Sequence, residues 1–129
     1  MESGVPPAVE ALLTGDRVVA HLATSTEDRP HVAPVWYRYE DGTVEVVTTG
    51  RKLANVRENP RVALSVQHDA DGHPEWAVTL RGTATVVEDE AANREANWRI
   101  NEKYGADPDD WSENTLVRID VGSADLQRY

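Results

Sequence analysis

Two cations follow a glycine in the stretch TTGRKLANVRENP, residues 48–60, and Lys52 is one of only two lysines in a chain with 23 acidic residues. LANVREN has the spacing of a short helix that must end before Pro60, so Arg51 and Lys52 would stand in its first turn. The helix dipole disfavours cations there by roughly 0.3–1 kcal/mol each. The two cations become favourable if an anion binds there, held by the hydroxyls of Thr48 and Thr49, the free backbone N–H groups after Gly50 and both cationic side chains. The stretch therefore predicts a phosphate site formed by Thr48, Thr49, Arg51 and Lys52.

Other reactive side chains give no stronger signal. The chain has no cysteine, which excludes disulfides, thiolate nucleophiles and thiolate metal sites. His68 and His73 flank the turn HDADGH and could bind a metal with Asp69 or Asp71, but exposed turn histidines are commoner, so we predict no metal site. Without a Ser–His–Asp motif the sequence identifies no catalytic residue, and a redox step would belong to a bound cofactor.

The overall charge limits the possible partners. The formal net charge is -10 and the pI is near 4.7, which argues against nucleic acid. The acidic surface also leaves an alternative to the phosphate site, in which Arg51 and Lys52 are exposed and paired with acids such as Glu58. Eleven arginines, two lysines and no phenylalanine resemble the halophilic composition of proteins from a high-salt cytoplasm. Because no apolar run approaches the roughly 20 residues of a membrane helix, and no signal peptide is seen, we expect a cytoplasmic protein.

Short β-branched and aromatic runs alternate with turn sequences, and these elements must position the phosphate site. Helices are expected at residues 6–14, before Pro60 and at 89–104, the last with Asp89 as its N-cap. Gly82 predicts a bulge or bend, and the acidic loop 105–115 is expected to be solvated surface. Six strands are expected, the first three as a meander, at residues 17–24, 31–39, 43–49, 61–67, 75–88 and 116–122. The chain is thus predicted to be one domain, residues 1–129, with a mainly β fold: a six-stranded antiparallel barrel, closed or half-open, with flanking helices.

HLATSTEDRPHVAPVWYRYEDGTVEVVTTGRKLANVRENPRVALSV, residues 21–66, closely resembles the core of the flavin-binding split barrels related to pyridoxamine 5′-phosphate oxidase. Short members of that family show a pattern like LAT…DGRPHVSPVWF…DG…TxxxxRKxxNLRxNPRVALSV. The match extends over about residues 18–88 and is specific in order and spacing. The resemblance implies a six-stranded Greek-key split barrel that forms a homodimer. It also implies FMN, or the deazaflavin coenzyme F-420, bound in two grooves between the subunits.

The resemblance also implies cofactor-binding residues at both ends of each groove. The phosphate contacts of the family match Thr48, Thr49, Arg51 and Lys52, and the flanking helix positions are Asn55 and Arg57. The strand beside the isoalloxazine ring matches Pro34, Val35 and Trp36. Residues 76–78 would contribute the wall from the other subunit. A six-stranded barrel is filled by its own side chains, so a three-ring cofactor must bind outside it, in a crevice that two copies would form twice.

The activity that the resemblance implies is that of an FMN-dependent oxidoreductase, transferring hydride to or from a small organic substrate. One alternative is a reductase that uses coenzyme F-420, whose acidic tail would be bound by arginines such as Arg57, Arg61 and Arg81. Another is a flavin- or haem-binding module without turnover. The C-terminal SADLQRY resembles none of the substrate-binding motifs of the longer pyridoxamine phosphate oxidase, so we do not expect that particular activity.

Overall fold

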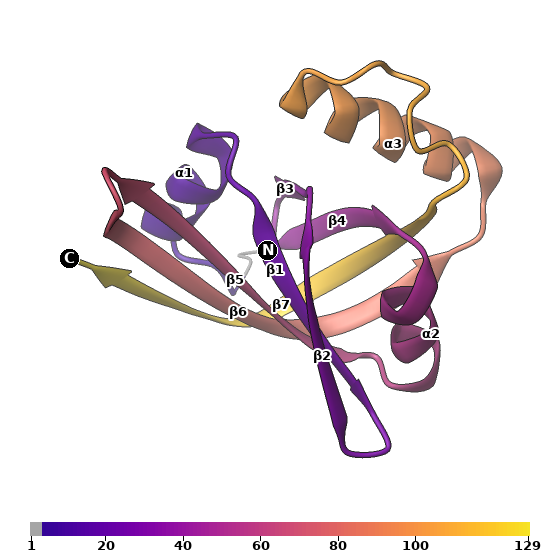
Figure 1. The fold of residues 1–129 in the computed structure, drawn as a ribbon, viewed down its shortest axis with the longest axis horizontal. Helices are drawn as coiled ribbons and strands as arrows, with labels where there is room; N and C mark the ends of the chain where they lie inside the picture. Colours follow the sequence, from indigo (N-terminus) through magenta and orange to yellow (C-terminus); the bar gives the residue numbers. More distant parts are fainter. Residues whose placement is uncertain (1–3) are drawn as a thin grey trace.

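The computed structural model describes residues 4–129, and these form one antiparallel sheet with three flanking helices (Figure 1). The elements in chain order are α1 (Pro7–Gly15), β1 (Ala20–Thr26), β2 (Arg29–Val35), β3 (Arg38–Glu40), β4 (Thr43–Thr48), α2 (Gly50–Glu58), β5 (Arg61–Ala70), β6 (His73–Val87), α3 (Glu90–Tyr104) and β7 (Thr115–Arg128). The predicted mainly β fold with flanking helices is confirmed.

The two edge strands of the sheet, β2 and β3, are neighbours in the chain. The strand order is β2-β1-β5-β6-β7-β4-β3, and only Trp36 and Tyr37 join the two edges. The sheet must therefore curl until its edges approach each other, so the barrel is closed through the chain and not by a ladder of hydrogen bonds. β4 and β5 follow each other in the chain, but β6 and β7 lie between them in the sheet. The link through α2 therefore passes over two strands, as a Greek-key connection does.

The predicted strand at residues 31–39 is wrong, because the chain leaves the sheet at Trp36 and Tyr37, and residues 4–129 form seven strands instead of six. The backbone there bonds to side chains of α3. The Tyr37 N–H donates to the Tyr104 hydroxyl at 3.4 Å, and the Tyr37 carbonyl accepts from Lys103 Nζ at 3.0 Å. Because β2 pairs only with β1, and β3 only with β4, the predicted three-strand meander is also wrong.

The bulge predicted at Gly82 is confirmed. The register between β6 and β7 shifts at Arg81/Gly82. A Cβ at position 82 would lie 2.4 Å from the Asp120 carbonyl oxygen and 2.9 Å from the Ile119 side chain, so only glycine permits this approach. The bulge bends the longest strand of the sheet, as a curved barrel requires.

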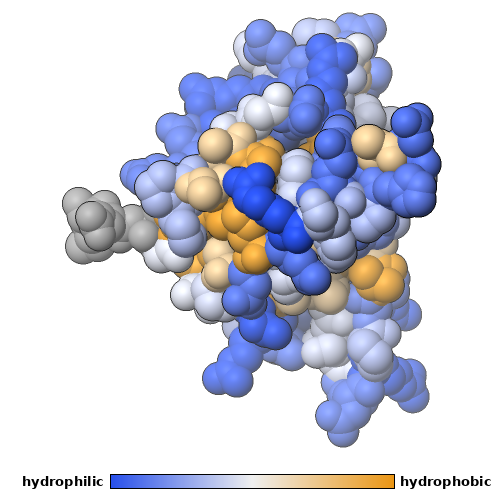
Figure 2. All heavy atoms as spheres, turned by 90° about the vertical axis from the view of Figure 1, so that its left-hand side faces the viewer, coloured by the Kyte–Doolittle hydropathy of each residue, from blue (hydrophilic) through white to orange (hydrophobic). Residues whose placement is uncertain are grey.

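Alternate strand residues fill the barrel, and the helices cover its openings. Leu22, Leu64, Leu80 and Ile119 are among the fully buried core residues. The helix α2 packs against β1 and β6, and α3 packs against β3, β4 and β7. Figure 2 shows the face that carries α1 and the outer ends of β5, β6 and β7, where apolar side chains gather at the centre with polar ones around them. Within residues 4–129, no helix has the length and apolar character needed to cross a membrane.

Asp89 caps α3 as predicted, since its carboxylate accepts from the Ala92 N–H at 2.9 Å. Asp89→Ala leaves that N–H without its partner and is expected to destabilise the protein by about 1 kcal/mol. The corresponding fall in Tm, measured by circular dichroism, is roughly 3–6 °C for a chain of this size. Asp89→Asn keeps an acceptor and is the matched control. Equal losses in the two variants would contradict the capping role.

Candidate functional site

One cavity of about 340 Å³ lies where β2, β4 and α2 meet the inner face of α3. Six of the nine predicted cofactor-binding residues line it, namely Pro34, Val35, Trp36, Thr48, Thr49 and Lys52. The helix α3 contributes Ile100 and Asn101, and the loop after it contributes Trp111 and Asn114. The volume falls within the range of roughly 300–1,000 Å³ that is typical of small-molecule sites. Residues far apart in the chain thus come together around one space.

The start of α2 forms the polar end of this cavity. Thr49 is the N-cap residue of α2, yet its side chain makes no capping hydrogen bond, and the first turn carries no acid. Gly50 has a φ of 67°, in the left-handed region that glycine enters without strain. Lys52 is half-buried, and within residues 4–129 no carboxylate pairs with Lys52 or Arg51, so the alternative pairing with Glu58 is not formed. This end offers an uncapped helix N-terminus, hydroxyls and an ammonium group to an anion.

The other three predicted residues lie outside the cavity lining. Arg51 is exposed at the start of α2. Asn55 is buried; its amide donates to Thr24 Oγ1 at 3.0 Å and its Oδ1 accepts from the Thr26 hydroxyl at 3.2 Å. Arg57 forms an ion pair of 2.9 Å with Glu88. The contacts of Asn55 fix α2 onto β1, while cofactor contacts by these three residues remain predictions.

Trp36 forms an aromatic wall that α3 holds in place. Its ring stacks on Tyr104, with 4.7 Å between the ring centroids and 4° between the planes. The Tyr104 hydroxyl donates to the Val18 carbonyl at 2.6 Å, and burial raises the pKa of Tyr104 to about 12. Tyr37 turns into the core, where its hydroxyl donates to the Leu13 carbonyl at 2.7 Å. The indole of Trp36 is therefore a fixed surface for a planar ligand.

The contacts by which α3 fixes the loop that follows it were not predicted from the sequence. Asn97 Nδ2 donates to the Asp110 carbonyl at 2.8 Å, and Asn101 Nδ2 donates to the carbonyls of Pro108 and Asp110 at 3.0 and 2.9 Å. Most residues of the loop are exposed, as predicted, but the loop is also tied to the helix, and Trp111 takes a place in the cavity lining with a φ of 60°. The signal present in the sequence was the i, i+4 repeat of asparagine along the face that also carries Ile100.

Asn101, which lines the cavity, also carries an unpaired acceptor. Its Oδ1 is buried without a hydrogen-bond partner among the described residues, and the residue is 0% exposed. Both amide hydrogens are committed to backbone carbonyls, which fixes the orientation of the side chain. A buried acceptor left unpaired costs about 1–3 kcal/mol, and an N–H or O–H donor of a bound cofactor would remove that cost. An anion site, an aromatic wall and this acceptor together fit the chemistry of a flavin or deazaflavin cofactor with a phosphate group.

The remaining candidates lie elsewhere. His68 Nδ1 is 2.7 Å from a carboxylate oxygen of Glu75, and its Nε2 is 3.8 Å from Asp16, so its contacts are not with His73. No group of three or more metal-ligating side chains occurs in the part of the chain that the structure describes. The side chains of Trp76 and Val78 are buried in the core of their own chain.

Lys103 supports the segment that carries Trp36, and it makes stability depend on pH. Its Nζ lies 3.6 Å from the centroid of the Tyr37 ring, and burial lowers the pKa of Lys103 to about 8. An unfolded lysine titrates near pH 10.4, so between about pH 8 and 10 the unfolded chain binds more protons and stability rises with pH. Above about pH 10 the trend reverses, because burial raises the pKa of Tyr37 and Tyr104 and the unfolded tyrosines ionise first.

The variant Lys103→Met is expected to lose the rise in stability between about pH 8 and 10. Urea unfolding at closely spaced pH values measures it. Lys52→Met, at the other lysine of the chain, is the control and keeps the rise. An unchanged pH dependence in Lys103→Met would show that another group is responsible.

Comparison with known proteins agrees with this geometry. The family model for pyridoxamine 5′-phosphate oxidase matches residues 7–128. An FAD-binding protein from Mesorhizobium loti is 26% identical with a TM-score of 0.74, and the match covers 94% of this chain and 92% of that one. A structure described as an F420 reductase is 24% identical, with a TM-score of 0.77 and coverage of 94% and 98%.

A haem storage protein from Vibrio cholerae shares the fold, with 19% identity, a TM-score of 0.77 and coverage of 99% of this chain and 95% of that one. A search among curated proteins gave no match. The family model spans almost the whole chain, including the strands and the helix α2 that line the cavity. The chain therefore belongs to the pyridoxamine 5′-phosphate oxidase family of split barrels.

Proposed function

We propose that this protein is an FMN-dependent oxidoreductase that binds the FMN phosphate at the start of α2 and acts on a small organic substrate. The observation that carries the proposal is the single cavity that joins Thr48, Thr49 and Lys52 to the aromatic wall of Trp36. FMN, when bound, supplies the hydride-transfer chemistry. The chain's own residues then have to bind it, orient it and exclude water.

Each part of the cavity has a task in this proposal. Lys52 and the uncapped N–H groups of α2 neutralise the phosphate. Trp36, fixed by Tyr104, sets the plane of the ring, and Asn101 Oδ1 accepts a hydrogen bond from a donor of the cofactor. No carboxylate or histidine is among the described residues that line the cavity, so this chain places no strong acid or base beside the ring. Protein groups would therefore control binding and orientation more than proton transfer.

We further propose that two copies of the chain share the groove. Val19 and Trp111 line the cavity and are 40% and 50% exposed, which leaves apolar surface at its mouth for a second copy to cover. Sedimentation in molar salt, with FMN bound, is expected to show a dimer. A monomer that retains FMN would overturn the shared groove.

A reductase dependent on coenzyme F-420 is the second candidate. Arg61 and Arg81 line one cavity of about 640 Å³ on the strand pair β5–β6, and Arg81 pairs there with Ala63. Arg81 lies 3.8 Å from Asp125, and both side chains are largely exposed, so this pairing would compete only weakly with an acidic ligand. Two arginines at one cavity suit the poly-acidic tail that distinguishes this coenzyme from FMN.

Titration of the apo-protein separates these candidates. Apo-protein is titrated with FMN, coenzyme F-420 and haemin, each followed by its visible absorbance. Saturable FMN binding, followed by reduction with a nicotinamide donor under anaerobic stopped flow, is the expected result. Preference for coenzyme F-420 would favour the second candidate, and tight binding without reduction by any donor would indicate a carrier.

A further inference from the structure

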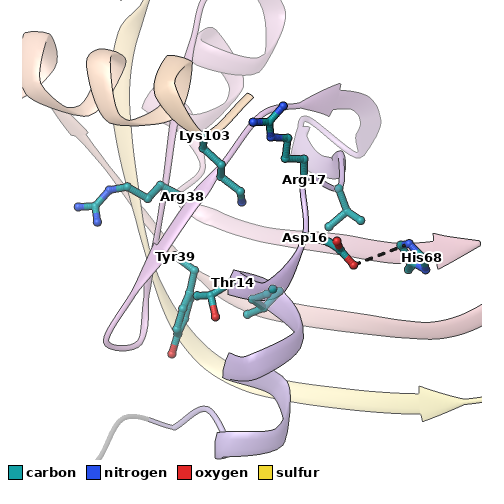
Figure 3. Close-up of a pocket in the computed structure, with 10 residues that line it drawn as sticks. Thr14, Asp16, Arg17, Arg38, Tyr39, His68 and Lys103 are labelled. Atoms are coloured by element: carbon teal, nitrogen blue, oxygen red, sulfur yellow. Dashed lines mark ion pairs between the residues drawn. The ribbon is translucent and has the colours of Figure 1, made fainter. Parts of the chain in front are cut away.

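A second cavity, of about 610 Å³, is lined by residues that include those labelled in Figure 3. The end of α1, the residues after it, β3, β5 and the last turn of α3 form its walls. Its polar lining consists of Thr14, Asp16, Arg17, Arg38, Tyr39, His68 and Lys103. None of these residues lines the proposed cofactor cavity.

Two cations in this cavity lack acidic partners. Lys103 is the only lysine besides Lys52, and both lysines line cavities. Within the described chain, no carboxylate lies at ion-pair distance from Lys103 or Arg17. The absence of acidic partners is unexpected in a protein with a net charge of -10, where acids are plentiful. Arg17 lies against the C-cap residue of α3, since a Cβ on Gly105 would be 3.3 Å from Arg17 Nη1, and it lines the same cavity as Lys103.

The surroundings of Lys103 contain no negative charge that balances its ammonium group within the described residues. Its ammonium group has one backbone hydrogen bond, to the Tyr37 carbonyl, and two aromatic rings nearby. Burial lowers the pKa of Lys103, so the group has lost water without gaining a counter-ion. The C-terminal end of α3 attracts cations through the helix dipole, but that effect is small and does not explain why acids are absent.

The other charged residues of the cavity are already engaged. Arg38 forms ion pairs with Glu40 and Glu45, and Figure 3 shows its guanidinium pointing away from Lys103. Asp16, the one carboxylate in the lining, lies 3.8 Å from His68 Nε2. His68 in turn contacts Glu75 through Nδ1 at 2.7 Å. Arg17 and Lys103 are therefore the two cations available to a ligand.

We propose that this cavity is a second binding site, which takes the carboxylate or phosphate group of a small organic molecule between Arg17 and Lys103. The guanidinium of Arg17 can bind two oxygens of such a group side by side, and the ammonium of Lys103 adds a point charge from the buried side. Leu13 and Val18 supply an apolar wall for the rest of the molecule.

The two cavities share a wall. Val35 and Trp36 line the first cavity, Arg38 and Tyr39 line the second, and Tyr37 lies between them. Lys103 and Tyr104 hold the carbonyl and the N–H of Tyr37. An anion that draws the Lys103 ammonium away from the Tyr37 carbonyl is therefore expected to change the environment of the Trp36 side chain in the cofactor cavity.

The site is tested by nuclear magnetic resonance in the Lys52→Met variant, because that background removes anion binding at the start of α2. Sodium phosphate and sodium benzoate are titrated separately, with sodium chloride at equal ionic strength as the reference. We expect saturable amide shifts centred on Thr14, Arg17, Lys103 and Gly105 with at least one of the two probes, and a smaller shift at the Trp36 indole. Whichever probe saturates identifies the anionic group that the site prefers.

Arg17→Gln in the same background separates specific from general binding. Arg17 is exposed, so the variant is expected to fold, and it should weaken binding of the active probe about 10-fold or more. Arg29→Gln removes an exposed arginine of β2 outside both cavities and should leave the affinity unchanged. Shifts that grow linearly with both probes, or equal affinities in the Arg17 and Arg29 variants, would overturn the proposal.

Discussion

Replacing Lys52 by glutamate is expected to weaken FMN binding by at least about 100-fold while the protein stays folded. Lys52 is half-buried in the cavity lining with Thr48 and Thr49, and no carboxylate of the described chain competes for it. The change removes a charge-assisted hydrogen bond, worth roughly 1.5–3 kcal/mol, and places a negative charge beside the phosphate. A 100-fold loss corresponds to about 2.8 kcal/mol, which the lost bond and the added repulsion together exceed.

The measurement is a titration of apo-protein with FMN, followed by quenching of flavin fluorescence, with thermal unfolding as a check of the fold. Arg29→Glu is the matched control, because it makes the same change of charge at an exposed position outside the cavity. It reports the effect of net charge alone and is expected to change the affinity less than about 2-fold at moderate salt. Wild-type affinity in Lys52→Glu would show that the phosphate binds elsewhere.

The predictions that held from sequence were those set by local physics. Asp89 accepts a hydrogen bond from a backbone N–H three residues away, and Gly82 allows a close approach to the backbone of the neighbouring strand. An aspartate before a helix and a glycine within a strand have few other structural roles. The convergence of Thr48, Thr49 and Lys52 also follows from a short stretch, because a strand end, a glycine and a helix start fix their mutual positions. Residue type and spacing suffice where the partner is nearby in the chain.

The predictions that failed depended on partners far away in the chain. The pattern of β-branched and aromatic residues continues through Trp36 and Tyr37, and the sheet ends there because Lys103 and Tyr104 take over the hydrogen bonds of the Tyr37 backbone. The loop after α3 is exposed at most positions, as its acidic composition predicts, but the hydrogen bonds by which Asn101 ties it to the helix were not predicted. Charge and periodicity carry no information about such long-range contacts, so the α3 side of the cavity could not be foreseen.

Asn101→Ala is expected to weaken FMN binding about 10-fold, because it removes the one buried acceptor of the cavity that has no partner within the described residues. The substitution also frees the Pro108 carbonyl and leaves the Asp110 carbonyl bonded to Asn97 alone, so the loop that carries Trp111 loosens. The matched control is Asn97→Ala, which removes the other hydrogen bond to the Asp110 carbonyl from a residue that does not line the cavity. Its effect on FMN affinity measures the contribution of the loop alone.

A comparison of FMN with 3-methyl-FMN then identifies the donor that Asn101 Oδ1 accepts from. If that donor is the imide N–H of the ring, methylation weakens binding to the wild type about 3- to 10-fold and has little further effect in Asn101→Ala, as one shared hydrogen bond requires. If the donor is a ribityl hydroxyl, the loss in Asn101→Ala persists and the effect of methylation is the same in both proteins. Equal FMN affinities in the Asn101 and Asn97 variants would show that the acceptor does not contact the cofactor, since both variants loosen the loop and only one removes the oxygen from the cavity.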